Sequence, residues 1–182
     1  MNITLPHRIK NDLGEELIFH RMENEDGEEK LIVECYVEPN AGPIMHTHHK
    51  QDESFTVLNG KLGYQLKGEE PCFAGVGETV FFKRGVPHRF WNAGKNELNC
   101  YGYIKPANNV VFYLTALFNA QKESGKEIPE PFDAAYLLYR YRKEYGMPGL
   151  PRFVNAVIIP ATYTIGKLRG RYKKFEQAPE PM

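Results

Sequence analysis

The sequence predicts a mainly β fold, an antiparallel barrel or sandwich, with an α-helical appendage after it. Seven segments in the first half of the chain alternate with the two-residue period of a β-strand, and turn-rich stretches such as 23–29 and 38–42 separate them. After Pro106 the apolar residues instead recur with the wider spacing of amphipathic helices. The predicted strands cover residues 16–21, 30–37, 54–58, 61–66, 79–82, 88–92 and 98–104.

Three helices are predicted beyond Pro106. Asn108 is a candidate N-cap for the first helix, whose apolar stripe begins at Val111. The second helix is expected over residues 133–146, where it ends at a glycine. The third is expected over residues 151–168, and Pro160 should place a kink inside it, because proline cannot donate a helical hydrogen bond.

Length and composition are those of one globular domain with an appendage. The chain has 182 residues, of which 42% are hydrophobic and 25% are charged, as in an ordinary compact protein. We therefore expect a barrel over residues 1–105. A C-terminal helical extension over residues 106–182 should pack on the barrel or at a subunit interface.

The cysteines and the start of the chain favour a cytoplasmic location. The three cysteines are widely spaced and form no Cys-x-x-Cys pair, so neither a disulfide framework nor a thiolate metal site is expected. Residues 1–10 contain no apolar run like that of a secretory signal. No segment approaches the roughly 20 apolar residues that a membrane-spanning helix needs. The sequence therefore argues against both export and membrane spanning.

Two blocks of the chain carry residues that suit one metal site. Side chains alternate across a strand, so His46 and His48 project to the same face. Glu53 would point to the other face of a straight strand, so the polar segment 49–52 must bend or bulge to return it. His88 follows in a later predicted strand. Three imidazoles and a carboxylate supply nitrogen and oxygen donors that suit a first-row divalent metal.

Neighbours of this set leave alternatives open. Gln51 is an alternative ligand, because its side-chain carbonyl oxygen can take the place of the Glu53 carboxylate. His49 should point away from the metal unless a bulge begins at that residue. Aromatic residues at inward strand positions are candidates for the wall of an apolar cavity around the metal. These candidates are Phe55, Tyr64 and Phe90.

The two blocks resemble the paired motifs of the cupin superfamily. The first block is His46, His48, Glu53 and Gly60, and the second is Gly77, Gly85, His88 and Asn92. The resemblance covers roughly residues 10–105. It departs from the family pattern at Lys83, where a proline is usual, and at Gly42, which precedes His46 by four residues rather than six. The resemblance implies a double-sheet antiparallel jelly-roll barrel, a homodimer, and a metal held by His46, His48, Glu53 and His88.

The same resemblance implies a cofactor but does not select one reaction. We expect one divalent transition-metal ion per chain, either Fe, Mn, Ni, Co or Zn. The favoured function is a metal-dependent, dioxygenase-like oxidoreductase that acts on a small organic molecule. One alternative is a non-catalytic module that binds a small molecule. Another is a barrel attached to a membrane or a partner by its basic C-terminal helices.

The zero net charge of the chain hides an uneven distribution. Residues 139–175 contain nine basic residues and one acidic residue, a balance of +8, so the rest of the chain carries −8. We expect this basic segment to dock on an acidic barrel, its own or a partner's, because surface charges are more often paired or solvated than ligand-specific. Contact with an anionic membrane is the less favoured interpretation. No helix-turn-helix pattern indicates binding to nucleic acid.

Overall fold

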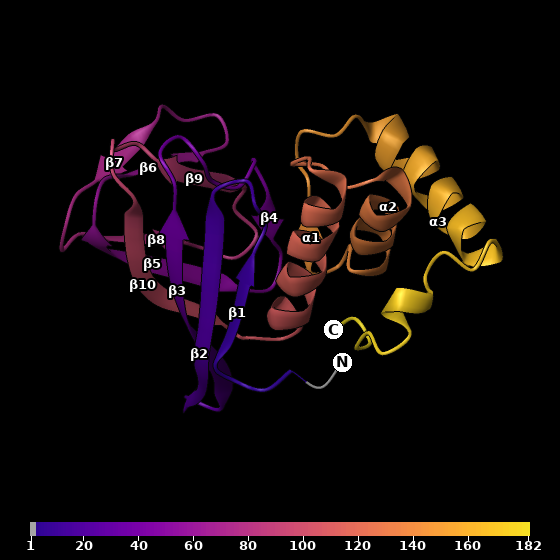
Figure 1. Cartoon of the computed structure of the whole chain (residues 1–182), viewed down its shortest axis with the longest axis horizontal. Helices are drawn as coiled ribbons and strands as arrows, with labels where there is room; N and C mark the ends of the chain where they lie inside the picture. Colours follow the sequence, from indigo (N-terminus) through magenta and orange to yellow (C-terminus); the bar gives the residue numbers. More distant parts are fainter. Residues whose placement is uncertain (1–2) are drawn as a thin grey trace.

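The protein consists of a β-barrel followed by a set of helices (Figure 1). The structure is a computed structural model that describes residues 3–182. Residues 1 and 2 lie outside this range. They belong to the predicted barrel domain, residues 1–105, and to residues 1–10, which were considered for a secretory signal. The barrel strands are β1 (His7–Lys10), β2 (Glu15–Glu25), β3 (Glu28–Val37), β4 (Thr47–His48), β5 (Asp52–Asn59), β6 (Leu62–Leu66), β7 (Cys72–Ala74), β8 (Thr79–Phe82), β9 (His88–Asn92) and β10 (Leu98–Lys105).

The strands form the two facing antiparallel sheets of a jelly roll, which confirms the predicted fold class. The larger sheet has six strands in the order β1-β2-β3-β10-β5-β8, and the smaller has the order β7-β6-β9. A short third pairing joins β4 to β11 (Tyr145–Gly146), which belongs to the C-terminal part of the chain. The isolated bridge between His46 and His88 links the loop before β4 to the smaller sheet.

The hydrophobic core fills the space between the sheets and continues into the first helix. Val33 from the larger sheet packs with Leu62 and Phe90 from the smaller one. Val110 and Phe118 of α1 (Val110–Ser124) belong to the same buried cluster, so α1 closes one side of the barrel. Burial of such side chains supplies most of the driving force for folding.

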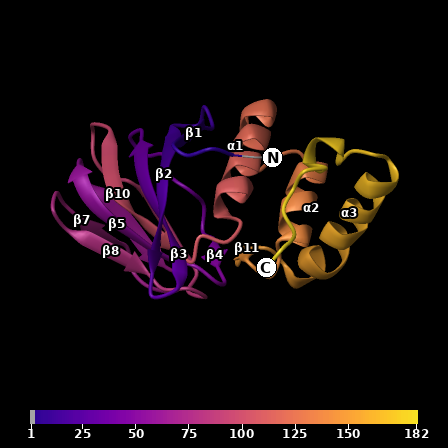
Figure 2. The same ribbon diagram turned by 90° about the horizontal axis from the view of Figure 1, so that it is seen from below.

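The helices lie in sequence order away from the barrel. Figure 2 shows α1 between the barrel and α2 (Pro131–Arg140), with α3 (Ile159–Leu168) on the far side of α2. A π-helical turn, η1 (Val154–Ile158), leads into α3, and a 3-10 turn, η2 (Lys173–Phe175), follows it. Helix α3, which lies within the basic segment, therefore packs on α2, whereas Tyr145–Gly146 of the same segment pairs with β4 of the barrel.

The predicted strands agree with the structure apart from their ends and two short omissions. The predicted turn 23–29 is too wide, because β2 and β3 run on to Glu25 and Glu28. Only Asp26 and Gly27 form the hairpin loop, and both have positive φ (55° and 81°), as a two-residue turn of this hand requires. The strands β1 and β7, of four and three residues, were not predicted.

The predicted helix ends need correction. Asn108 does not cap α1: it has a φ of 43°, and the N-cap is Asn109, whose side chain makes no cap hydrogen bond. The second helix ends at Arg140 instead of Gly146, because Tyr145–Gly146 forms a strand against Thr47–His48. The expected irregularity at Pro160 takes the form of the preceding π-helical turn. Within residues 3–182 no helix combines the length and apolar character needed to cross a membrane.

Candidate metal centre

The four residues of the predicted metal set lie together inside the barrel. His46, His48, Glu53 and His88 each offer one donor atom, and these atoms lie within 4.8 Å of one another. His48, Glu53 and His88 are buried, with exposed fractions of 5%, 5% and 1%. We call these four residues the His/Glu cluster. The structure thus makes the cluster a candidate metal-binding site.

The segment after His48 provides the register change on which Glu53 depends. Strand β4 ends at His48 and β5 begins at Asp52, so residues 49–51 form a bend between two strands. The Gly85 N–H donates to the carbonyl oxygen of His48 at 2.7 Å, which fixes the end of β4. The predicted break in register is therefore present, and it turns Glu53 back toward the histidines.

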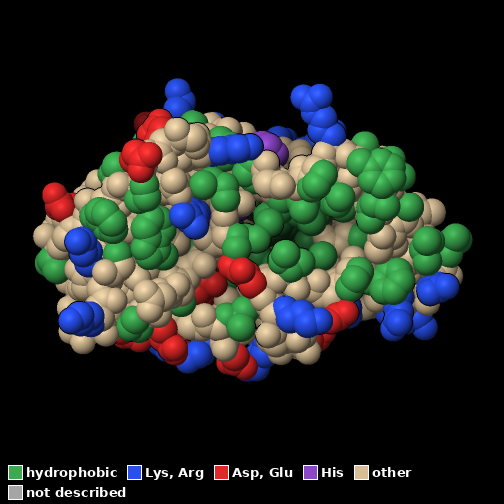
Figure 3. All heavy atoms as spheres, turned by 90° about the horizontal axis from the view of Figure 1, so that it is seen from above, with side chains coloured by type: hydrophobic (Ala, Val, Ile, Leu, Met, Phe, Trp, Pro, Cys, Tyr) green, Lys and Arg blue, Asp and Glu red, His purple; other side chains and the backbone are tan. Residues whose placement is uncertain are grey.

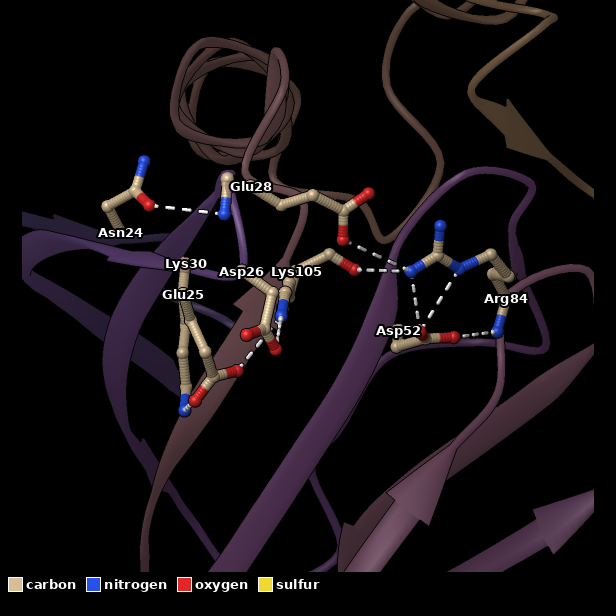
Figure 4. A network of polar contacts seen from close by, with 9 residues as sticks. Asn24, Glu25, Asp26, Glu28, Lys30, Asp52, Arg84 and Lys105 are labelled. Carbon is tan, nitrogen blue, oxygen red and sulfur yellow. Dashed lines mark hydrogen bonds and ion pairs between the residues drawn. The ribbon is translucent and has the colours of Figure 1, made fainter.

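An ion pair at the rim of the barrel fixes the residue before Glu53 (Figure 4). Arg84 donates to Asp52 from its backbone N–H at 2.7 Å and from Nε and Nη2 at 3.0 and 2.7 Å. A side chain held by three charge-assisted bonds has little freedom to slip in register. Farther along the rim, Lys105 and Lys30 both contact Glu25, at 3.0 and 2.9 Å.

Backbone carbonyl groups orient two of the imidazoles. Nδ1 of His46 lies 2.8 Å from the carbonyl oxygen of Ile44, and Nδ1 of His88 lies 2.9 Å from that of Val86. Because a carbonyl oxygen only accepts, both Nδ1 atoms carry a proton, and in a neutral ring Nε2 is then the atom with the lone pair. This is the tautomer that a ligand of a metal through Nε2 requires.

The cluster contains one close His–Glu contact and one buried histidine nitrogen without a hydrogen-bond partner among residues 3–182. Nε2 of His88 lies 3.2 Å from Oε2 of Glu53, and the His88 ring stacks on Phe82 at 4.2 Å between centroids. Nδ1 of His48 is buried and has no hydrogen-bond partner among residues 3–182. A buried polar atom without a partner is costly, so its presence favours a site that binds something else.

Electrostatics keep the cluster in the charge state that metal binding needs. Burial, together with the neighbouring His48 and His88, lowers the pKa of His46 to about 3, and burial also lowers the pKa of His48. Burial alone would raise the pKa of Glu53, but the His88 hydrogen bond and the nearby imidazoles outweigh it and lower this pKa to about 2. At neutral pH His46 and His48 are therefore uncharged donors and Glu53 is a carboxylate, which fits a divalent first-row metal.

The alternative ligand, Gln51, contacts a tyrosine of the C-terminal part of the chain. Its side chain is buried, Nε2 donates to the Tyr145 hydroxyl at 3.3 Å, and Oε1 has no partner in the part of the chain that the structure describes. His49 lies outside the His/Glu cluster, as parity predicted. The backbone N–H of His49 donates to the Glu144 carbonyl oxygen. The His49 ring packs on Gly146, where a Cβ atom would lie only 2.7 Å from Nε2 of His49.

Tyr145 is a site residue that the sequence did not identify. It pairs directly with His48 in the β4–β11 ladder, and its ring lies 5.4 Å from the His48 ring. On its other side it stacks on Tyr113 of α1 at 3.8 Å between centroids. No local pattern could have revealed it, because the strand pairing joins residues almost one hundred positions apart in the sequence.

A cavity of about 140 Å³ opens onto the cluster between the barrel and the helices, on the hollowed face of Figure 3. Of the predicted wall residues, Phe55 and Phe90 line it, whereas Tyr64 does not and instead lies against Phe82, at 6.1 Å between ring centroids. The apolar lining includes Leu17, Val33, Ile44, Phe55, Phe90, Ile104, Leu114, Leu117, Phe118, Leu137 and Leu138.

The cavity has a second polar region, also missed by the sequence analysis. Glu15 lines the cavity, and Asn11 Nδ2 donates both to its Oε1 at 2.8 Å and to Oε1 of Gln121 at 3.1 Å. Burial raises the pKa of Glu15 to about 7, against the lowering effect of the Asn11 hydrogen bond. Close to neutral pH this carboxyl group is therefore only partly ionised.

Comparison with protein families agrees with the fold. Residues 33–101, from the second half of β3 to the middle of β10, match the family described as the cupin domain. This range contains all four residues of the His/Glu cluster. A curated relative, the oxidoreductase iacF of Pestalotiopsis fici, is 40% identical over 50 residues. That match covers 28% of this chain and 24% of the relative, so the chain spans only about a quarter of the relative's length.

Solved structures with a similar barrel have low sequence identity. KdgF from Halomonas sp. is 14% identical, with a TM-score of 0.49 over 58% of this chain and 92% of the other. The cupin domain of Schizosaccharomyces pombe Cnp3 is 16% identical, with a TM-score of 0.42 over 52% and 67%. A predicted oxalate decarboxylase from Thermotoga maritima is 22% identical, with a TM-score of 0.44 over 57% and 92%.

Proposed function

Because residues 33–101 form a cupin domain, we propose that the protein is a metal-dependent, dioxygenase-like oxidoreductase acting on a small, largely apolar molecule. One observation carries this proposal: an apolar cavity opens directly onto the buried His/Glu cluster. A metal held there would meet substrate in a site largely screened from water. Active sites commonly combine apolar walls with a few convergent polar groups in this way.

His46, His48, Glu53 and His88 would hold the ion. The backbone carbonyls behind His46 and His88 fix Nδ1 as a protonated atom, which leaves Nε2 as the donor atom of each neutral ring. A bound divalent ion supplies Lewis acidity and, if it is iron or manganese, redox chemistry. The Glu53 carboxylate offsets part of the ion's charge in a region where water cannot.

The cavity walls favour a small substrate with one polar end. Phe55 and Phe90 pack against each other at 5.2 Å between centroids and line the cavity beside the cluster. The Tyr145 hydroxyl accepts a hydrogen bond from Gln51, so its own proton remains available to a polar group of the substrate. An apolar molecule whose hydroxyl or carboxylate faces the cluster would satisfy both features.

The name of the curated relative supports the class of reaction. That protein is an oxidoreductase, and 50 of its residues align with this chain at 40% identity. Since the match spans 24% of the relative, its substrate gives no guide to the substrate here. The proposal therefore extends to the type of chemistry and to the general nature of the substrate.

Oxygen consumption tests the proposal. Protein loaded with Fe(II) would be supplied with small apolar molecules that carry one hydroxyl or carboxylate, and oxygen uptake would be compared with product formation by mass spectrometry. We expect both with at least one compound, and we expect His48→Ala to abolish both. His20→Ala is the matched control, because His20 lies outside the cluster and pairs with Glu34 at 3.0 Å. Binding with thermal stabilisation but no product would instead identify a non-catalytic module.

A further inference from the structure

Helix α3 is apolar on two sides, although only one side is packed against the protein. On the inner side Ile159 is buried, and the Tyr163 ring lies 4.6 Å from that of Tyr139 on α2. The Tyr172 side chain, which follows α3, packs directly on Gly166. Any larger residue at 166 would clash, because a Cβ there would be 2.3 Å from the Tyr172 hydroxyl oxygen. These contacts attach α3 to α2 and account for one apolar side.

The other side of α3 and its π-helical lead-in are exposed to solvent. Leu168 is 83% exposed and Phe153 is 64% exposed. Between them, Val157, Ile158 and Ile165 are nearly half exposed. Positions 157, 161, 165 and 168 recur at helical spacing, so they form one stripe along the helix. We call this surface the outer α3 face. Its large apolar residues are Phe153, Val157, Ile158, Ile165 and Leu168.

Basic residues flank the outer α3 face. Lys167, Arg169 and Lys173 are exposed, and none of them has an ion-pair partner within residues 3–182. Residues 145–175 contain no aspartate or glutamate and six lysines and arginines. In Figure 3 Lys and Arg side chains lie beside the hydrophobic ones at the end of the molecule formed by α3.

We propose that the outer α3 face docks on an anionic membrane surface, with the helix lying in the plane of the lipid headgroups. A helix with an exposed apolar stripe, basic flanks and no acidic residues is suited to this position. Its aliphatic side chains would enter the headgroup region, and its lysines and arginines would meet lipid phosphates and carboxylates. Within the described chain no helix can cross a membrane, so the contact is peripheral.

Charge favours a lipid surface over a second copy of the chain. A two-fold contact between outer α3 faces would bring Lys167, Arg169 and Lys173 of one copy close to the same residues of the other, with no acidic residue from 145–175 to offset them. Like charges placed together across an interface oppose association. An anionic membrane instead supplies the negative charge that this face lacks.

Vesicle co-sedimentation of the full chain tests the proposal. Vesicles of phosphatidylcholine alone would be compared with vesicles that also contain phosphatidylserine. We expect binding to the mixed vesicles, weakening as salt rises, and little binding to phosphatidylcholine alone. Leu168→Glu should reduce binding at least about tenfold, because it removes apolar burial and adds a repelled charge.

Two further variants separate the apolar and electrostatic contributions. Lys167→Gln with Arg169→Gln should lower affinity for the mixed vesicles by about tenfold or more. Val76→Glu is the matched control, because Val76 is 66% exposed on the barrel and should leave vesicle binding unchanged. Equal sedimentation of the wild type and Leu168→Glu would overturn the proposal. So would a dimer in light scattering that Leu168→Glu dissociates while neither protein binds vesicles.

Discussion

The barrel interior and the outer α3 face depart from the usual distribution of side chains in opposite ways. Inside the barrel, four ionisable residues are gathered where apolar residues normally lie. On α3, large apolar residues and unpaired cations share an exposed surface. Buried charge and exposed apolar surface both cost free energy unless something compensates. The difference fits our two proposals, in which a metal compensates the first region and a lipid surface compensates the second.

The largest expected effect compares two leucines from the helices. Leu137 of α2 is 1% exposed, whereas Leu168 of α3 is 83% exposed. Leu137→Ala should lower the free energy of unfolding by about 2–5 kcal/mol, because it leaves a cavity in the packed core. Leu168→Ala should change it by less than about 0.5 kcal/mol. Urea denaturation measures both, and a large cost at Leu168 would mean that its side chain is packed in solution.

The second comparison uses two histidine–glutamate pairs, one buried and one near the surface. Glu53→Gln should weaken metal binding about 100-fold or more, because it removes the only carboxylate of the cluster. Glu34→Gln breaks the pair with His20 and should leave metal affinity unchanged. Competition with a chromogenic chelator measures both affinities. Similar affinities in the wild type and Glu53→Gln would remove Glu53 from the ligand set.

A third prediction concerns pH and the polar region of the cavity. The pKa of Glu15 is about 7 when folded, against an ordinary value of 4.5, so the folded protein binds more protons between these values. Stability contributed by this group is present below pH 4.5 and is lost as pH rises through 7. Glu15→Gln should therefore gain stability relative to the wild type as pH rises, by about 1–3 kcal/mol at pH 8.

Denaturation at a series of pH values checks this prediction. Glu16→Gln on the same strand is the control, because Glu16 pairs with Arg8 at the surface. A constant difference between the wild type and Glu15→Gln from pH 4 to pH 8 would show that the Glu15 carboxyl group is not perturbed.

The smallest effect tests the contact between the helical extension and the cluster. Tyr145→Phe removes the hydroxyl that accepts the Gln51 hydrogen bond and keeps the ring that stacks on Tyr113. It should lower the free energy of unfolding by about 1–2 kcal/mol, because the buried Gln51 amide loses its partner. Gln51→Leu combined with Tyr145→Phe should cost less than the sum of the two single changes, and a double-mutant cycle measures this coupling.

The histidines were predictable from the sequence because strand parity is local. His46 and His48 share a face, and the polar residues 49–52 indicated the bend that Glu53 requires. The contact that holds this bend was not predictable, since Asp52 and Arg84 are 32 positions apart and form no periodic pattern. Local periodicity therefore located the cluster but not the interactions that fix it.

The C-terminal part of the site was missed for a related reason. Residues 133–146 have helical spacing, yet the helix ends at Arg140 so that Tyr145 can pair with His48. Long-range pairing overrides local propensity here, and residues of α1, equally distant in sequence from the histidines, also line the cavity. The division at residue 105, the subunit arrangement and the identity of the metal stay predictions.

Metal analysis of protein purified without added metal or chelator is the decisive measurement for the His/Glu cluster. We predict about one divalent transition-metal ion per chain, from the group Fe, Mn, Ni, Co and Zn, in the wild type. We predict none in His48→Ala, with His20→Ala retaining the wild-type content. A wild-type protein that is folded, free of these metals and unable to take them up from solution would contradict the prediction.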